Sequence, residues 1–70
     1  MGQTISNEVY TLRSGRNVTQ EELAAAVRVT RQTIIAIEKG NYIPSLLLAM
    51  KIARFFKKSV EEVFSITNEK

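Results

Sequence analysis

Arg31 and Gln32 place a guanidinium and a carboxamide next to each other, and both groups can form paired hydrogen bonds with a planar partner. In duplex DNA, a guanidinium pairs in this way with the edge of guanine, and a carboxamide with adenine. Ile35 and Ala36 follow closely; an isoleucine can contact the thymine methyl group, and a small alanine lets a helix enter a groove deeply. These four side chains are the predicted base contacts, and they predict double-stranded DNA as the partner.

The segment that carries these residues is expected to be a helix. Thr30 is a suitable N-cap, and Gly40 provides a stop after about residue 38 or 39. With residues at about 100° intervals around the axis, Ile34 and Ile37 share the core side with Thr30. Arg31 lies between the two sides at the N-terminal end, where it can reach outward. The opposite side holds Gln32, Ile35, Ala36 and Lys39.

A second helix is expected directly before this one. Thr19 and Glu22 form a capping box at its start, and an apolar stripe follows. Only about three residues separate the two helices, so we expect a near-perpendicular crossing rather than a hairpin. The small Ala24 allows the close approach that this crossing needs. Residues 19–39 therefore predict a helix-turn-helix. The apolar stripe consists of Leu23, Ala24 and Val27.

Groups around the starts of these two helices are suited to holding DNA phosphates. Backbone amides at a helix N-terminus bind anions, and Gln20, Thr30 and Thr33 can add side-chain contacts. Arg28, in the turn, is also predicted to reach a phosphate. Two interpretations of Lys39 stay open, a phosphate contact or a solvated charge favoured by the helix dipole.

Three further helices are expected, so that the whole fold is predicted to be all-α. They cover about residues 7–16, 46–56 and 59–65. No stretch shows sustained alternation of apolar and polar residues, so no sheet is expected. The polar ends, 1–7 and 67–70, are expected to be frayed. The chain is therefore predicted to form a single domain, 1–70, that folds as a compact five-helix bundle.

The composition excludes several classes of function. The chain has no cysteine and no histidine, so it lacks thiolate chemistry, histidine acid–base catalysis and the commonest zinc sites. The adjacent Glu21 and Glu22 are explained by helix capping, and no nucleophile–base pair or phosphate-binding glycine loop is present. We therefore expect no catalytic residue, no metal and no cofactor. The net charge of +3 is compatible with a nucleic-acid partner.

The apolar segments are too short for a membrane protein. The longest run, Leu46–Met50, falls far below the ~20 residues that cross a bilayer. Residues 1–7 lack the apolar region of a signal peptide. We therefore expect a cytoplasmic protein with no membrane contact. No ligand-binding domain is expected, and hence no small-molecule ligand.

An ordered series of short motifs resembles the Cro/repressor-like helix-turn-helix transcriptional regulators, also called the xenobiotic-response-element class. The resemblance implies a lambda-repressor-like fold in which Arg31 and Gln32 contact bases, while Gln20, Asn41 and Tyr42 contact or approach the DNA backbone. The motifs span almost the whole chain at the family's spacing. They are Leu12–Arg13, Val18–Ala24, Val29–Ile34, Ile37–Gly40, Pro44–Leu46, Leu48–Ala49, Lys51–Ala53 and Ser59–Phe64.

The resemblance also implies one structural pair and marks two departures. Arg13 is expected to pair with Glu38, and the helical projection agrees, because Glu38 leans toward the core side. Arg28 stands where the family typically has glycine in the turn, and a left-handed conformation there costs a non-glycine residue roughly 1 kcal/mol. Lys57 likewise stands where the family usually ends the fourth helix with glycine.

Two apolar residues of the fourth predicted helix, Leu47 and Met50, project away from its core stripe. Single exposed apolar residues are common, which is one explanation. The other is a two-fold dimer contact, helped by Phe55 or by residues after Phe64. The basic stripe on the same helix is expected to be a solvated face rather than a second nucleic-acid surface. It comprises Lys51, Arg54 and Lys58.

These observations predict a sequence-specific transcriptional regulator. The expected mode is repression by a homodimer on a two-fold-symmetric operator, with half-sites about 10 bp apart. An alternative is a protein-interaction module, such as an antitoxin-type helix-turn-helix protein whose main role is to bind a partner protein. A protein with that role is expected to carry an extra segment that wraps around its partner. Only about six residues follow Phe64, although the fourth predicted helix could still dock a partner.

Overall fold

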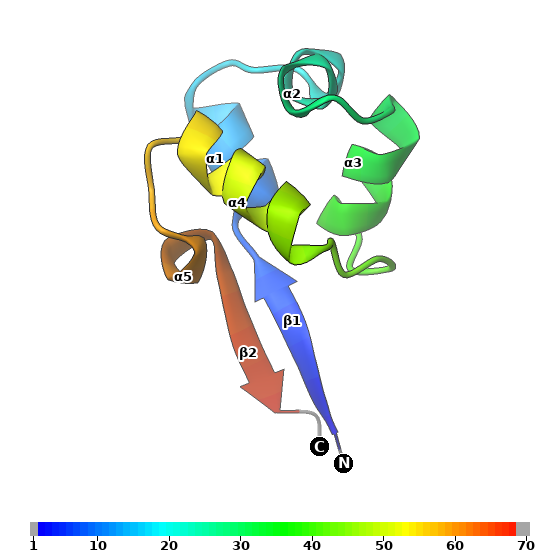
Figure 1. Ribbon diagram of the computed structural model, residues 1–70, viewed down its shortest axis with the longest axis vertical. Coiled ribbons are helices and arrows are strands. Elements are labelled where there is room, and N and C mark those ends of the chain that lie inside the picture. Colours follow the sequence, from blue (N-terminus) through cyan, green and yellow to red (C-terminus); the bar gives the residue numbers. More distant parts are fainter. Residues whose placement is uncertain (1, 69–70) are drawn as a thin grey trace.

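The computed structural model describes residues 2–68 and contains the five predicted helices together with one small sheet (Figure 1). Each helix begins and ends within about one or two residues of its predicted bounds, which is the usual uncertainty of helix ends. In chain order the elements are β1 (Gln3–Asn7), α1 (Val9–Gly15), α2 (Gln20–Val27), α3 (Arg31–Glu38), α4 (Leu46–Phe55), α5 (Val60–Val63) and β2 (Phe64–Asn68).

The sheet corrects the prediction of a purely helical fold. β1 and β2 pair in antiparallel register, from Gln3 opposite Asn68 to Asn7 opposite Phe64. The predicted fraying was therefore wrong for residues 3–7 and 67–68, while residues 1 and 69–70 lie outside the described part of the chain. Each strand has only five residues, too few to show sustained alternation, and its partner lies at the other end of the sequence.

The two strands form a ribbon that extends from the helical body (Figure 1). Directly opposed residues of an antiparallel pair lie on one face, so Ile5 and Ile66 share one face of the ribbon, together with the pair Gln3 and Asn68. The other face carries hydroxyl groups. Ser6 Oγ lies 2.9 Å from Ser65 Oγ, and Thr67 donates to Ser6 at 3.1 Å. The ribbon thus has one apolar pair at the centre of one face and hydroxyl groups on the other face.

Asn7 ties the ribbon to the helices. Its side-chain amide donates to the carbonyl of Ile37 in α3 at 3.0 Å, and its oxygen accepts from the backbone amide of Val9 at 3.1 Å. The backbone amide of Glu8 also donates to the carbonyl of Val63 at 2.9 Å. These contacts join the start of α1 to both α3 and the end of α5.

Side-chain caps define the starts of α2, α3, α4 and α5, whereas the N-cap of α1, Glu8, makes no such bond. The hydroxyl at each of the four other N-caps accepts a hydrogen bond from the backbone amide three residues later, and both predicted capping boxes are present, at Thr19 with Glu22 and at Ser59 with Glu62. Such a cap stabilises a helix by typically ~1 kcal/mol. The four hydroxyl N-caps are Thr19, Thr30, Ser45 and Ser59.

The turn between α2 and α3 passes through a left-handed residue that is not glycine. Arg28 has φ 66°, and the amide of the next residue, Val29, donates to the carbonyl of Ala24 at 2.9 Å. Lys57 at the end of α4 has φ 58°, and Asn17 after α1 has φ 56°. Both positions at which this chain departs from the family's glycine therefore keep the left-handed backbone.

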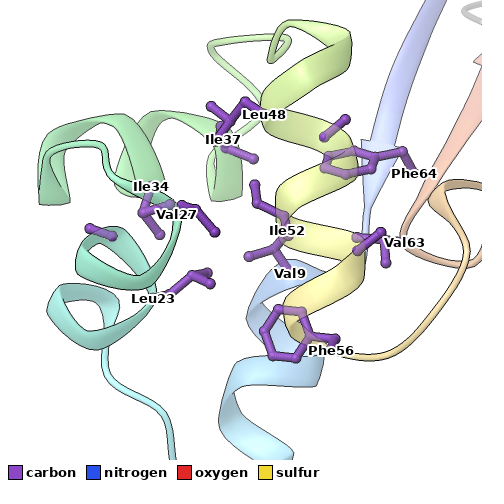
Figure 2. Packing of buried hydrophobic residues seen from close by; sticks show 13 residues of the cluster. Val9, Leu23, Val27, Ile34, Ile37, Leu48, Ile52, Phe56, Val63 and Phe64 are labelled. Carbon is purple, nitrogen blue, oxygen red and sulfur yellow. The ribbon is translucent and has the colours of Figure 1, made fainter.

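One apolar core joins all five helices to the start of β2 (Figure 2). Ala24 is 3% exposed where α2 approaches α3, so the small residue predicted for this crossing lies in the core. Among the described residues, every one that is buried as a whole is hydrophobic. No described helix is long and apolar enough to cross a membrane. The core consists of Val9, Leu23, Ala24, Val27, Ile34, Ile37, Leu48, Ala49, Ile52, Ala53, Phe56, Val63 and Phe64.

Candidate nucleic-acid interface

Helix α3 is anchored by one side and exposed by the other. Ile34 and Ile37 are fully buried, as the helical projection requires. Arg31 and Gln32 are exposed on the first turn of the helix. Ile35 and Ala36 are half-buried, so each offers only part of its surface; Lys39 is exposed at the C-terminal end of the helix. The polar candidates are thus the most accessible.

An ion pair joins α1 to α3. Arg13 Nε donates to Glu38 Oε2 at 2.7 Å, and Arg13 Nη2 donates to Glu38 Oε1 at 3.1 Å. The remaining terminal nitrogen of Arg13 donates to the carbonyl of Val18 at 3.0 Å. The two side chains are only 13% and 8% exposed. The hydrogen bond with Glu38 raises the pKa of Arg13, although burial acts in the opposite direction.

Gln20 extends this pair to the exposed end of α3. Its amide nitrogen donates to Glu38 Oε1 at 3.1 Å, which directs its amide oxygen toward Arg31. That oxygen accepts from Arg31 Nε at 3.3 Å. A chain of polar contacts therefore runs from Arg13 through Glu38 and Gln20 to Arg31. Gln20 was predicted only as a contact to the DNA backbone. Its bridge was missed because residues 20, 31 and 38 do not lie on one helix.

Arg31 also has a weak charged neighbour. Its Nε lies 3.8 Å from Glu21 Oε2, and both side chains are more than half exposed. Such a pair is screened by water and contributes little to stability. Both contacts of Arg31 involve Nε, so among the described residues its terminal guanidinium nitrogens form no hydrogen bond and stay accessible at the surface.

The candidate phosphate contacts fall into two groups. Thr30 and Thr33 lie at the start of α3, where Thr30 Oγ1 accepts from the amide of Thr33 at 3.3 Å. Their hydroxyl oxygens are 3.2 Å apart. Arg28 is exposed in the preceding turn. At the other end of α3, Lys39, Asn41 and Tyr42 are exposed. The two groups flank the exposed side of α3.

The candidate dimer contacts differ in accessibility. Leu47 and Met50 are 64% and 47% exposed, as expected. Phe55 is half-buried against the core and meets Phe56 edge to face, with ring centroids 5.0 Å apart. Its packing within the monomer reduces what it could offer to a second chain.

Comparisons with known proteins agree with this geometry. The helix-turn-helix family model matches residues 9–63. The uncharacterized HTH-type transcriptional regulator YgzD of Bacillus subtilis (strain 168) is 49% identical over 65 residues, which cover 93% of this chain and 98% of YgzD. The uncharacterized regulator MJ0272 of Methanocaldococcus jannaschii is 53% identical over 60 residues, covering 86% of this chain and 91% of MJ0272.

A named repressor and a solved structure are also similar. The cryptic phage CTXphi transcriptional repressor RstR of Vibrio cholerae is 35% identical over 60 residues, which cover 86% of this chain and 54% of RstR. The crystal structure of the transcriptional regulator VanUg has the same fold over 99% of this chain and 92% of VanUg, with a TM-score of 0.78 and 23% identity. The chain therefore belongs to the Cro/C1-type helix-turn-helix family and is a transcriptional regulator that binds double-stranded DNA rather than an enzyme.

Proposed function

We propose that α3 reads the base sequence in the major groove, with Arg31 and Gln32 as its principal contacts and Ile35 and Ala36 beside them. One observation carries this proposal. The exposed guanidinium of Arg31 is held at the first turn of α3 by Gln20, and Gln20 is itself held by Glu38. A side chain that is already positioned loses less conformational entropy when it binds, which favours a directional contact with a base edge.

We call the proposed base contacts, Arg31, Gln32, Ile35 and Ala36, the reading surface. The phosphate contacts in this proposal lie on both sides of it. Near the start of α3, phosphates are contacted by Gln20, Thr30 and Thr33, together with Arg28 in the turn. Near the C-terminal end of α3, phosphates are contacted by Lys39, Asn41 and Tyr42. Contacts of this kind set the position of the protein on the duplex without selecting a base. In this proposal Gln20 contacts a phosphate and also accepts the hydrogen bond from Arg31.

The regulator acts in this proposal as a cytoplasmic homodimer on a two-fold operator, with half-sites about 10 bp apart. The small size of the domain favours a dimer, because one core of this size supplies little stability. Repression is supported by the similarity to RstR, whose name gives it that role. No small-molecule ligand is part of the proposal. The sequence-based candidates for the dimer contact are Leu47, Met50 and Phe55.

Selection of binding sites from random duplex DNA, followed by affinity measurements, tests the reading surface. The wild-type chain is expected to enrich one sequence and to bind it less tightly as salt rises. Arg31→Ala should lose about 1–3 kcal/mol and relax one base position. Arg54→Ala is a matched control, since Arg54 is an exposed arginine on α4, and it should change neither. Equal losses on all sequences with Arg31→Ala would reduce Arg31 to a phosphate contact.

A further inference from the structure

The carboxylate of Glu38 lies two hydrogen bonds away from Arg31, although it is itself almost buried. Its side chain is only 8% exposed, so it has little surface to offer to DNA. We propose that Glu38 is nevertheless a positioning residue for base selection: it fixes the orientation of the Gln20 amide, and Gln20 in turn fixes which edge of the Arg31 guanidinium faces the duplex. This inference deepens the proposed function and rests on the contact of Arg31 with a base.

The carboxylate sets the orientation of the Gln20 amide. An ionised carboxylate only accepts hydrogen bonds, whereas a carboxamide donates through its nitrogen and accepts through its oxygen. Glu38 Oε1 lies 3.1 Å from Gln20 Nε2, so the amide nitrogen faces Glu38 and the amide oxygen is turned toward Arg31. The opposite orientation would place the amide oxygen against the carboxylate. The negative charge of Glu38 therefore selects one of the two orientations of Gln20.

The selected orientation occupies one edge of the Arg31 guanidinium. Gln20 Oε1 accepts from Arg31 Nε at 3.3 Å, and the carboxylate of Glu21 lies 3.8 Å from the same nitrogen. A guanidinium can form paired hydrogen bonds along the edge of Nε and one terminal nitrogen, or along the edge of its two terminal nitrogens. Because Nε is engaged, the edge of the two terminal nitrogens is the one presented to a partner. Paired donors of this kind match the O6 and N7 acceptors of guanine.

Arg13 holds the carboxylate in place at the other end of this chain of contacts. Arg13 Nε donates to Glu38 Oε2 at 2.7 Å, and Arg13 Nη2 donates to Oε1 at 3.1 Å, so Oε1 accepts from both Arg13 and Gln20. The guanidinium of Arg13 is itself fixed by its hydrogen bond to the carbonyl of Val18. The acceptor that orients Gln20 is thus anchored within the helical body and not at the exposed surface.

Glu38→Gln changes the charge of this side chain while keeping its shape. A carboxamide has one acceptor oxygen, and a donor group replaces the other oxygen. The remaining oxygen should stay with Arg13 Nε, which makes the shorter contact, so the new amide nitrogen takes the place of Oε1 and faces Gln20 Nε2. The Gln20 amide should therefore turn over and bring its own nitrogen against Arg31 Nε. Arg31 is then released, because two donors do not bond to each other.

Gln20→Met is a second variant, and it leaves the ion pair of Arg13 and Glu38 intact. Methionine has a similar length and no amide group, so Arg31 loses its acceptor. Glu21→Gln is the matched control, because it removes the other carboxylate near Arg31 Nε and leaves Gln20 unchanged. Circular dichroism checks that all three variants fold.

The preference for guanine at one operator position measures the effect. The affinity of each variant is compared on the selected operator and on an operator with that guanine replaced, at one salt concentration, so that losses of phosphate contact cancel in the ratio. The wild type should prefer the guanine operator by about 5- to 150-fold. Ordering one flexible side chain costs about 2- to 12-fold in affinity, so Glu38→Gln and Gln20→Met should each reduce the preference by about that factor. Glu21→Gln should leave it within about twofold of the wild type.

The double variant and Arg31→Ala complete the test. Glu38→Gln combined with Gln20→Met should reduce the preference no further than either change alone, because both interrupt the same chain of contacts. A Glu38→Gln variant that loses stability but keeps the full preference for guanine would make Glu38 a structural brace only and overturn the proposal. So would reductions that multiply in the double variant. A wild-type preference that Arg31→Ala leaves intact would instead contradict the proposed function itself, and the role of Glu38 in base selection would fall with it.

Discussion

The helix pair α2–α3 and the ribbon β1–β2 lie toward opposite ends of the longest axis of the molecule and are held in different ways (Figure 1). The helix pair has local N-caps, five buried core side chains and a polar bridge that reaches Arg31. The ribbon has non-local backbone pairing and one apolar pair, Ile5 with Ile66, of which Ile66 is strongly exposed. The helix pair is thus braced by its own side chains, whereas the ribbon leaves Ile66 largely exposed.

The largest expected difference between these regions is in core stability. Ile34→Ala removes a fully buried side chain of α3 and should lower the free energy of unfolding by about 2–5 kcal/mol. Thr67→Ala, on the exposed hydroxyl face of the ribbon, should change it by less than about 0.5 kcal/mol. Urea denaturation measures both. Similar losses at the two positions would mean that the ribbon surface contributes as much stability as the core of α3.

The polar bridge should be the next most sensitive feature. Glu38→Ala leaves the guanidinium of Arg13 nearly buried without its carboxylate and should cost about 2–3 kcal/mol. Glu21→Ala removes only the exposed partner of Arg31 and should cost less than about 0.5 kcal/mol. Thermal unfolding of both variants provides the comparison. A loss at Glu38 no greater than the loss at Glu21 would show that the bridge does not brace the helix pair.

The two capping boxes allow a matched comparison of the regions. Thr19→Ala at α2 and Ser59→Ala at α5 should each cost about 1 kcal/mol. Hydrogen exchange should show where each loss is felt: in the amides of α2 for Thr19→Ala, and in α5 and β2 for Ser59→Ala. If either variant accelerated exchange equally in both regions, the helix pair and the ribbon would unfold as one cooperative unit rather than two.

The left-handed turn should separate stability from DNA affinity. Arg28→Gly relieves the positive φ and should stabilise the fold by about 0.5–1 kcal/mol. It should also weaken DNA binding on all sequences and reduce the salt dependence by about one ion. Asn17→Gly, another left-handed position, is the control and should leave DNA affinity unchanged. Unchanged affinity in Arg28→Gly would remove Arg28 from the phosphate contacts.

The smallest expected effect is the loss of the stabilisation from Glu62 at acidic pH. Hydrogen bonds from the backbone and the hydroxyl of Ser59 lower the pKa of Glu62 from its ordinary value of 4.5. A lowered folded-state pKa means that Glu62 contributes its stabilisation above about pH 4.5 and loses it as the pH falls through the folded value. An NMR titration should place its midpoint below that ordinary value. A midpoint at or above it would contradict the capping box in solution.

The helices were predictable because their signals are local. Thr19 with Glu22, Thr30 and Ser59 each determine a helix start within a few residues of sequence, and the apolar spacing of α4 identified its buried side. The left-handed turn at Arg28 was implied by the family's glycine at that position. Each of these features depends on residues that are close along the chain.

The ribbon and the bridge were missed because their partners are distant in sequence. Ile5 pairs with Ile66, and neither strand alone is long enough to show a period of two. Gln20 meets both Arg31 and Glu38 only after α2 and α3 have crossed. The base contacts lie on a single helix, so a helical projection of the sequence could place them. Gln20, which holds Arg31, lies on another helix and could not be placed in this way.

A thermodynamic cycle between residue 31 and its base tests the reading surface most directly. Binding is measured for wild type and Arg31→Ala, each on the selected operator and on an operator with the guanine of one half-site replaced. The wild type should lose about 1–3 kcal/mol on replacement of that guanine, and Arg31→Ala should lose almost nothing further. An equal penalty for the wild type and the variant would show that Arg31 does not contact that base, and α3 would not read the duplex through its first turn.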